Sequence, residues 1–217
     1  MKKRGQSEIV AAAYDEGAES YRKNWNAPHP WMEDSRREFA SRVSAGMTLL
    51  DVGCGPGHDS DYWTKKGLKT LGVDLSPKTI EMAKSSYPSL DFRVADILTL
   101  REAENFDAVW MAYSFLHIPK ASAANLVRSI GRLIKPGGVF FVETSIADAT
   151  REEVRPIAGL TDGAGRKIEV PYTFWTVAEL NDLLQPAFAV EWSKSYTPDD
   201  RPPPVWAGIM RRGPKKL

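Results

Sequence analysis

A run of alternating glycines is the feature of this chain best suited to hold a ligand. Gly53, Gly55 and Gly57 follow an apolar stretch that includes Leu49 and Leu50. Such a stretch predicts the end of a buried strand, and glycines after it permit a tight turn and close approach of the backbone to a ligand. Residues 58–63 can begin a helix and place acidic side chains at its positive N-terminal end. The sequence therefore predicts a strand, a glycine turn and a helix that together cradle a cofactor.

The spacing of these glycines bears on the kind of cofactor. It is G-x-G-x-G, whereas a dinucleotide fingerprint has the spacing G-x-G-x-x-G. A dinucleotide places its pyrophosphate on exposed helix N–H groups, and Pro56 in the middle of this loop removes one donor. We therefore expect a cofactor without phosphates. An NAD-dependent oxidoreductase is the less favoured alternative.

Two further apolar stretches each end in a carboxylate. Asp74 follows residues 71–73 and precedes the helix-start signals Ser76 and Pro77. Asp96 follows the short stretch 92–95. Open α/β sheets bind ligands at the carboxyl ends of their strands, and a carboxylate there can accept hydrogen bonds from both hydroxyls of a ribose.

These segments together resemble the class I S-adenosyl-L-methionine-dependent methyltransferases. The matching runs are LLDVGCGPG at 49–57, LGVDLS at 71–76, FRVADI at 92–97, FDAVWMAY at 106–113 and RLIKPGG at 132–138. The resemblance covers residues 47–212 well and implies S-adenosyl-L-methionine as cofactor, with S-adenosyl-L-homocysteine as its product. It implies that Asp74 binds the ribose, that Leu75 packs on the adenine, and that Asp96 and the N–H of Ile97 bind the adenine edge. Further cofactor contacts are implied for Tyr14, Tyr21, Asp51, Gly53, Gly55, Gly57, Ala112 and Tyr113.

The order of predicted elements gives the fold class. Residues 47–143 alternate strand and helix at short intervals, which predicts a doubly wound parallel sheet. With two closing strands at 187–196 and 205–210, we expect an α/β, Rossmann-like, seven-stranded sheet with an antiparallel last strand. Residues 1–46 are expected to form a helical cap, with helices at 7–25 and 32–44. Residues 47–217 are expected to form the cofactor-binding domain. Residues 144–175 lack clear periodicity and are expected to be an irregular, substrate-facing insertion.

Methyl transfer from a sulfonium mainly requires that the acceptor be held in line and shielded from water. His117 follows the fourth predicted strand and is the candidate general base, with a structural histidine as the open alternative. Aromatic residues gather in the first helix and in the insertion, which suggests an apolar or aromatic small molecule, or an amine held by cation–π contact. The candidate substrate residues are Trp25, His29, Trp31, Tyr172, Phe174 and Trp175. Residues 1–31 are expected to form a lid over the cofactor.

Composition narrows the remaining possibilities. The 217 residues carry 29 Lys and Arg against 28 Asp and Glu, a net charge of +1, so we expect no nucleic-acid partner. No apolar run reaches the length of a membrane span, and the single cysteine indicates a reducing compartment, which we take as the cytoplasm. Three histidines and one cysteine give no zinc signature. We expect a monomer or homodimer, and a non-catalytic protein that binds S-adenosylmethionine for regulation stays open.

Overall fold

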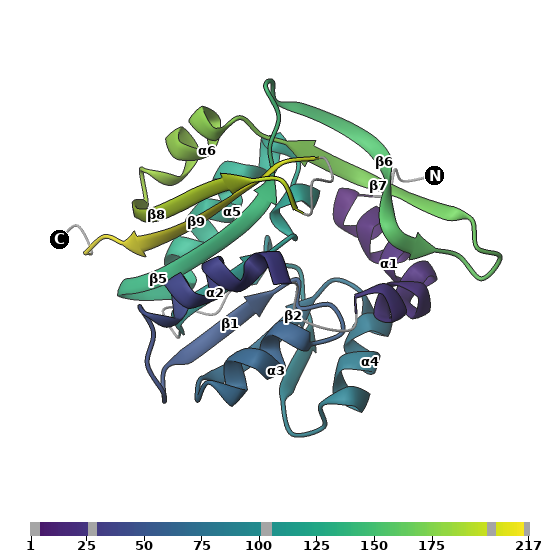
Figure 1. Ribbon diagram of the computed structural model, residues 1–217, viewed down its shortest axis with the longest axis horizontal. Helices are drawn as coiled ribbons and strands as arrows, with labels where there is room; N and C mark the ends of the chain where they lie inside the picture. Colours follow the sequence, from purple (N-terminus) through teal and green to yellow (C-terminus); the bar gives the residue numbers. More distant parts are fainter. Residues whose placement is uncertain (1–4, 26–29, 101–105, 199–202, 215–217) are drawn as a thin grey trace.

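A seven-stranded sheet with the order β3-β2-β1-β4-β5-β9-β8 forms the centre of the computed structural model, which describes residues 5–25, 30–100, 106–198 and 203–214 (Figure 1). Its strands are β1 (Thr48–Val52), β2 (Lys69–Asp74), β3 (Asp91–Val94), β4 (Phe106–Ala112), β5 (Ile134–Ser145), β8 (Phe188–Tyr196) and β9 (Val205–Arg212). Strands β1 to β5 pair in parallel, and β9 is antiparallel to both β5 and β8. The predicted fold class is confirmed.

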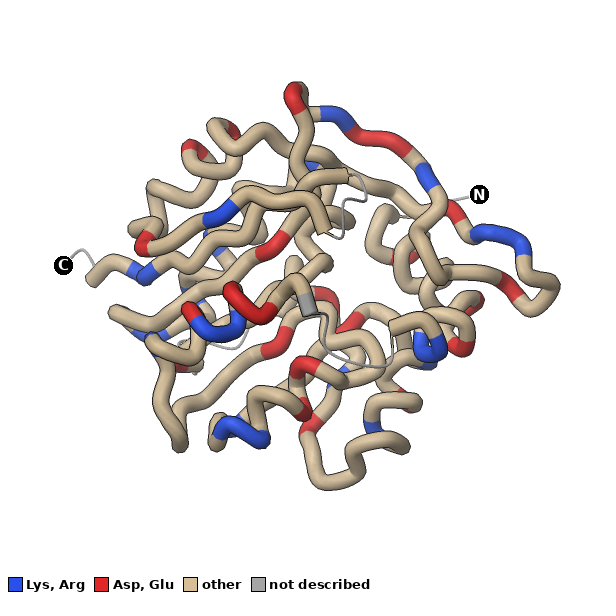
Figure 2. The backbone as a smooth tube through the Cα atoms, in the orientation of Figure 1, with Lys and Arg blue, Asp and Glu red and all other residues tan. Residues whose placement is uncertain are grey.

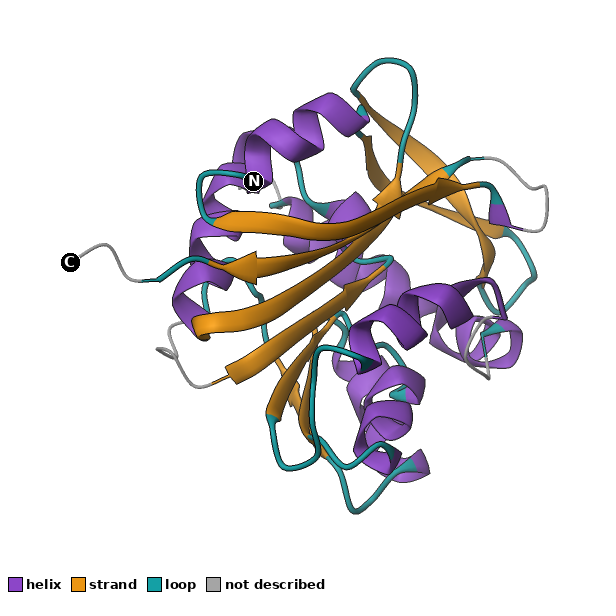
Figure 3. Cartoon of the chain, turned by 60° about the vertical axis from the view of Figure 1, so that its left-hand side comes forward, coloured by secondary structure: helices purple, strands orange, loops and turns teal. Residues whose placement is uncertain are grey.

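Helices cover both faces of this sheet (Figure 3). They are α1 (Gln6–Asn24), α2 (Glu33–Ala40), α3 (His58–Lys65), α4 (Pro77–Ser86), α5 (Lys120–Leu133) and α6 (Val177–Leu184), with short 3-10 turns η1 (Pro30–Met32) and η2 (Phe115–His117). On one face, α5 and α6 bury a helical stripe that includes Leu126 and Ile130 against the sheet. On the other face, Phe39 of α2 and Trp63 of α3 are fully buried. Among the described residues, no helix is both long and apolar enough to cross a membrane.

Strand β5 shows how the two faces are specified. Phe140 and Val142 point to the face of α5, and Val139 and Phe141 point to the face of α2 and α3, as the two-residue period of a strand requires. The ring of Phe141 stacks on Trp110 of β4 with centroids 3.8 Å apart. The next residue on this second face is Glu143, which is also fully buried. The carboxyl group of Glu143 therefore lies in line with the apolar side chains of Val139 and Phe141 on this face of β5.

The segment 144–175 corrects the expectation of an irregular insertion. It contains a two-stranded antiparallel sheet of β6 (Arg151–Thr161) and β7 (Lys167–Phe174) that stands away from the main sheet (Figure 1). The two-residue period is hidden in the sequence because the pairing shifts register between Pro156 and Thr161. Gly159, with φ of 78°, lies inside that shift. A bulge of this kind bends a strand without ending it.

Two smaller boundaries also differ from expectation. Helix α2 ends at Ala40, four residues before the predicted end at 44, because the chain turns there towards Gly46, whose φ is 88°. Residues 135–138, whose Pro136 and two glycines are typical of a turn, belong to β5, and Ile134 pairs with Phe106 before the register shifts. The predicted helical cap also divides in packing: α2 joins the core, whereas α1 packs on β6, β7 and α4.

Charged residues occur on every α-helix and every strand of the described chain (Figure 2). Along β6 the two signs alternate closely, and Glu153 pairs with both Arg151 and Arg155. These pairs are partly exposed and contribute little to stability. The described surface therefore carries mixed charge on the hairpin as well as on the main domain.

Candidate active site

Glycine occupies the three loop positions for different physical reasons. All three have a left-handed backbone conformation, with φ of 71° at Gly53, 50° at Gly55 and 93° at Gly57. A Cβ at Gly53 would lie 2.4 Å from Cβ of Ser114, and one at Gly57 would lie 2.8 Å from the Phe92 ring. A Cβ at Gly55 would meet only the ring of Tyr21, at 3.5 Å. Gly53 and Gly57 are thus required by packing within the protein, whereas Gly55 leaves free space beside the loop.

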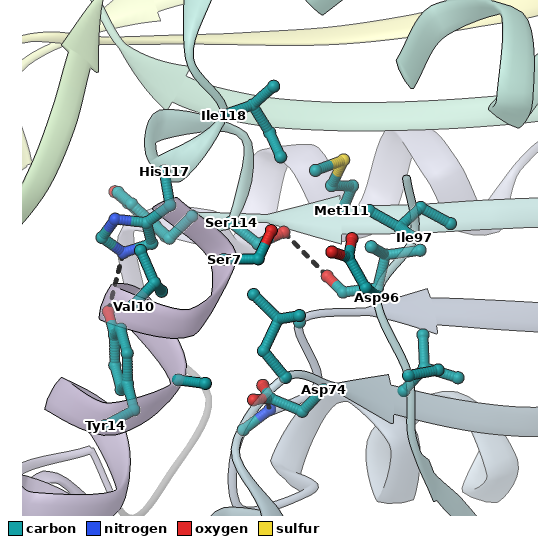
Figure 4. Close-up of a pocket in the computed structure, with 18 of the residues that line it drawn as sticks. Ser7, Val10, Tyr14, Asp74, Asp96, Ile97, Met111, Ser114, His117 and Ile118 are labelled. Carbon is teal, nitrogen blue, oxygen red and sulfur yellow. Dashed lines mark hydrogen bonds between the residues drawn. The ribbon is translucent and has the colours of Figure 1, made fainter. Parts of the chain in front are cut away.

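A cavity of about 830 Å³, including its open mouth, lies beside Gly55 at the carboxyl ends of β1, β2 and β4 (Figure 4). Helix α1 closes one side with Ser7, Val10 and Tyr14. Apolar walls come from Leu75, Ala95, Ile97, Leu98, Met111 and Ile118, and polar groups from Asp74, Asp96, Ser114 and His117.

Asp74, at the end of β2, is held in place by the backbone. Its Oδ2 accepts a hydrogen bond from the Gly55 N–H at 2.9 Å, and its Oδ1 accepts one from the Ser76 N–H at 2.9 Å. Burial raises the pKa of Asp74, and these backbone donors oppose that rise. Asp96 is anchored in the same manner, because its Oδ1 accepts from the Leu98 N–H at 2.8 Å. Each carboxylate keeps unused lone pairs for a ligand.

A second cavity lies on the other side of the glycine loop and is lined by charged residues. It shares a wall with the first, made of Tyr21, Gly53, Gly55, Ala112 and Tyr113. The Arg36 guanidinium lies 2.7 Å from Asp59 Oδ1, and the Trp110 indole donates to Asp59 Oδ2 at 2.9 Å. Asp51 accepts from the Ser60 hydroxyl at 2.6 Å. Burial and the neighbouring Asp59 raise the pKa of Asp51 to about 8.

His117 joins three segments at the edge of the first cavity. Its Nδ1 lies 2.9 Å from the carbonyl oxygen of Pro171 on β7, and its Nε2 lies 2.9 Å from the Tyr14 hydroxyl on α1 (Figure 4). A carbonyl oxygen only accepts, so Nδ1 carries the hydrogen and Nε2 accepts from Tyr14. Burial lowers the pKa of His117 to about 4, which keeps the ring neutral. Both ring nitrogens are thus engaged, and the base role of His117, which would require the Tyr14 bond to open, stays a prediction.

Hydrogen bonds hold helix α1 over the cavity at several points along its length. The Ser20 hydroxyl donates to the Thr161 carbonyl at 2.9 Å and accepts from the Thr161 N–H at 2.8 Å. The Trp25 indole donates to the Ala158 carbonyl at 3.1 Å. On the opposite side, Asp15 accepts from the Ser76 hydroxyl at 2.5 Å and from the Lys78 N–H at 3.0 Å. The helix therefore bridges the β6–β7 hairpin and the start of α4.

The structure brings most of the predicted residues together. The first cavity is lined by Tyr14, Tyr21, Gly53, Gly55, Asp74, Leu75, Asp96, Ile97, Ala112, Tyr113 and His117, and the second also by Asp51 and Trp25. Gly57 supports the loop from behind. The Trp31 indole donates to the Tyr113 hydroxyl at 3.1 Å. His29 lies outside the described residues.

Three aromatic residues predicted for the substrate lie behind the cavity walls. Tyr172 packs edge-on against the His117 ring at 6.1 Å between centroids. Phe174 is fully buried with Leu116 and Tyr172. Trp175 packs on Phe115 in the main core. The prediction of direct substrate contact is therefore corrected for Phe174, at the end of β7, and for Trp175, directly after it, because both side chains are buried in packed clusters.

The sequence did not single out several residues that the structure places at or beside the two cavities. These are Ser7, Val10, Arg36, Asp59, Ser114 and Glu143. Glu143 had a detectable signal, since it is a charge at the end of a continuous apolar run, 139–142. Arg36 and Asp59 had none, because a charged residue in a helix is normally solvated and only the fold brings these two within 2.7 Å.

We predict that α1 opens to admit the cofactor and that its hydrogen exchange reports this. With S-adenosylhomocysteine bound, amides across residues 7–24 should gain protection, because the bonds from Tyr14, Ser20 and Asp15 then hold a filled cavity. Amides of β1 and β4 should change little, because they lie in the core. Equal and strong protection of α1 with and without ligand would show a rigid packing helix instead.

Comparison with known proteins agrees with this geometry. Residues 49–138 match a family model described as a methyltransferase domain. A ubiquinone biosynthesis O-methyltransferase of Xanthomonas oryzae pv. oryzae is 34% identical over 106 residues, which are 46% of this chain and 44% of that protein. One of Methylocella silvestris is 34% identical over 114 residues, 50% of this chain and 44% of that protein. The chain thus matches about half the length of these curated relatives.

Solved structures share the fold at lower identity. The 1,6-didemethyltoxoflavin-N1-methyltransferase of Burkholderia thailandensis, with bound 1,6-didemethyltoxoflavin and S-adenosylhomocysteine, superposes with a TM-score of 0.74 at 18% identity, covering 98% of this chain and 92% of that one. A methyltransferase of Methanosarcina mazei gives 0.72 at 16% identity, covering 82% and 98%. The [4+2]-cyclase SpnF gives 0.71 at 18% identity, covering 97% of each chain. Identities this low establish a common fold.

Proposed function

We propose that this chain, which belongs to the class I S-adenosylmethionine-dependent methyltransferases, transfers a methyl group from S-adenosylmethionine to an oxygen, nitrogen or carbon atom of a small molecule. The observation that carries the proposal is the position of Gly55. It forms part of the wall shared by the two cavities, with free space where a Cβ would be. Asp74 accepts a hydrogen bond from the Gly55 N–H.

The residues of the first cavity fit the adenosyl part of this cofactor. Asp74 would accept hydrogen bonds from the ribose hydroxyls, and Leu75 and Ile97 would supply apolar surface for the adenine. Asp96 would accept a hydrogen bond from the amino group of the base. None of these groups would suit a pyrophosphate, because two carboxylates face the cavity and would repel it.

The second cavity fits the amino-acid end of the cofactor. Arg36 can pair with its carboxylate, and Asp51 can accept from its ammonium group. A positive ammonium group would in turn favour the ionised form of Asp51, whose pKa is otherwise raised by burial and by Asp59. When bound, the cofactor supplies an electrophilic methyl group on its sulfonium. The protein's own residues position both reactants and exclude water beneath α1.

The acceptor would enter beside Tyr113, where the two cavities meet near the aromatic rings of Trp25 and Trp31. This setting supports an apolar or aromatic small molecule, or an amine recognised by cation–π contact. We further propose a cytoplasmic monomer or homodimer that does not act on nucleic acid. The balanced charge and the single buried cysteine, Cys54, support these expectations.

A protein that binds S-adenosylmethionine without transferring its methyl group is the second candidate. The fold permits it, since a [4+2]-cyclase has the same architecture, and the cofactor site is better defined than the acceptor site. An NAD-dependent oxidoreductase is disfavoured by the carboxylates in the first cavity and by the loop spacing.

Calorimetry and a transfer assay together test the proposal. We expect binding of S-adenosylmethionine and S-adenosylhomocysteine and no binding of NAD. We expect label from methyl-labelled S-adenosylmethionine to enter a panel of phenols, amines and an extract of small metabolites. NAD binding without a response to either sulfur compound would overturn the assignment, and cofactor binding without any transfer would favour the regulatory alternative.

A further inference from the structure

Glu143 is a buried carboxyl group for which the fold gives no structural reason. It continues the apolar series of Val139 and Phe141 on one face of β5 and is fully buried. The Ser35 hydroxyl approaches its Oε2 at 3.4 Å, and its Oε1 has no hydrogen-bond partner among the described residues. An unpaired buried carboxyl oxygen destabilises a fold. Its presence here therefore points to a role in function.

Tyr113 connects this carboxyl group with the two cavities. It directly follows β4, and its N–H donates to the Glu143 carbonyl at 3.1 Å. Among the described residues it is the one non-glycine with positive φ, at 53°. Such strain persists where surrounding contacts impose it, often at functional sites. The result is a tyrosine that lines both cavities while its neighbour on the next strand is Glu143.

The Tyr113 hydroxyl group accepts one hydrogen bond and can donate another. The Trp31 indole donates to its hydroxyl oxygen at 3.1 Å, so the hydroxyl hydrogen remains free to be donated elsewhere. The hydroxyl groups of Tyr113 and Tyr196 lie close enough to the Glu143 carboxyl group to lower its pKa. One further lone pair of the Tyr113 oxygen can accept a hydrogen from a molecule in the cavity.

The groups that act on the pKa of Glu143 come from four parts of the fold. Ser35 lies on α2, Asp59 on α3, Tyr113 directly after β4 and Tyr196 on β8, while Arg36 of α2 acts on Tyr196. Burial raises the pKa of Glu143 to about 7, and Asp59 adds to the rise, while the nearby hydroxyls of Tyr196, Tyr113 and Ser35 oppose it. Burial and the Glu143 charge raise the pKa of Tyr113, so its hydroxyl stays protonated at neutral pH. A carboxyl group that titrates near neutral pH suits proton transfer.

We propose that Glu143 receives the proton that the acceptor loses during methyl transfer, and that the Tyr113 hydroxyl relays it. This inference rests on the proposed function. The acceptor's O–H bond breaks and its hydrogen joins the Tyr113 oxygen, as the Tyr113 hydrogen moves to a carboxylate oxygen of Glu143. The electron pair left on the acceptor oxygen forms the new bond to the methyl carbon, and the electron pair of the carbon–sulfur bond stays on sulfur. Tyr113 is the catalytic residue, and Glu143 acts through it.

The relay also indicates the class of acceptor. A phenol has a pKa of about 10, so it retains its hydroxyl proton at neutral pH, and that proton must leave as the oxygen is methylated. An uncharged amine attacks with a lone pair already free and does not need a proton removed first. The geometry therefore favours a phenolic or catechol hydroxyl among the acceptors that the cavities admit.

Infrared titration of the ligand-free protein tests the first half of the inference. The protonated-carboxyl band of Glu143 should titrate near pH 7 in the native protein, and it is isolated by subtracting the spectrum of Glu143→Gln. It should move to higher pH in Tyr113→Phe, since that hydroxyl lowers the pKa of Glu143. Glu191→Gln, the same change at a surface ion pair with Arg211, should leave the band unchanged. The absence of a titrating band, or of a shift in Tyr113→Phe, would overturn the relay.

Turnover with catechol as the probe tests the second half. Glu143→Gln and Tyr113→Phe should lower kcat by roughly 10²–10⁴-fold and abolish the fall in kcat/KM below pH 7, while calorimetry shows unchanged affinity of Glu143→Gln for S-adenosylhomocysteine. Glu143→Gln with native turnover and pH profile would overturn the relay. Native protein that binds S-adenosylhomocysteine but does not methylate catechol would overturn the phenol assignment. Native protein that binds neither sulfur compound would overturn the proposed function itself.

Discussion

Gly55→Val should abolish detectable binding of S-adenosylhomocysteine while the protein stays folded. Gly55 lines both cavities, and the space beside it holds no protein atom closer than the Tyr21 ring at 3.5 Å. A valine side chain would project into the region where the cofactor and the loop must touch. Isothermal calorimetry should therefore show a loss of affinity of about a hundredfold or more, equivalent to about 2.7 kcal/mol.

Backbone strain alone does not account for this expectation, and a matched substitution separates the two effects. Gly46 also has positive φ, 88°, and a Cβ there would meet no atom within 4 Å. Gly46→Val should thus impose similar left-handed strain of about 1–2 kcal/mol, visible as a lower Tm, but leave S-adenosylhomocysteine affinity intact. Equal loss of binding in both variants would mean that strain, and not occupation of the cavity, is responsible.

The cofactor half of the site could be predicted because its signals are local in sequence. The turn after β1 needs glycines within five residues, Asp74 is the last residue of β2, and Asp96 lies shortly after the end of β3. The parallel sheet then brings these strand ends to one edge. The sequence therefore predicts both the fold class, which is confirmed, and a group of residues that the structure places around one cavity.

The acceptor half could not be predicted because its contacts are distant in sequence. Ser35 and Glu143 are 108 residues apart, and Tyr14 and His117 are 103 apart. No local pattern marks such pairs. The β6–β7 hairpin was missed for a different reason, since Pro156 and Gly159 lie in the register shift and mask its alternation. For the first two pairs, the packing of α1 and α2 on other elements decides the geometry.

Asp74→Ala should weaken S-adenosylhomocysteine binding by about ten- to hundredfold, because hydrogen bonds to a charged group are worth about 1.5–3 kcal/mol. Part of the loss would be indirect, since Asp74 also accepts from the amides of Gly55 and Ser76. Asp74→Asn separates the contributions: its carbonyl can still accept one of these amides, so the fold should be retained while affinity falls by less.

A second carboxylate provides the control for Asp74. Asp107 also accepts from a backbone amide, that of Thr48 at 2.8 Å, but it lies at the start of β4, at the opposite end of the sheet from both cavities. Asp107→Asn should lower Tm without changing S-adenosylhomocysteine affinity.

The pH dependence of S-adenosylhomocysteine binding adds an independent check of the role of Asp74. Burial raises the pKa of Asp74, so native affinity should decline on acidification at a higher pH than an exposed aspartate would cause, and this decline should vanish in Asp74→Asn. An unchanged dissociation constant in both Asp74 variants would show that the carboxylate only orders the loop and does not bind the ribose.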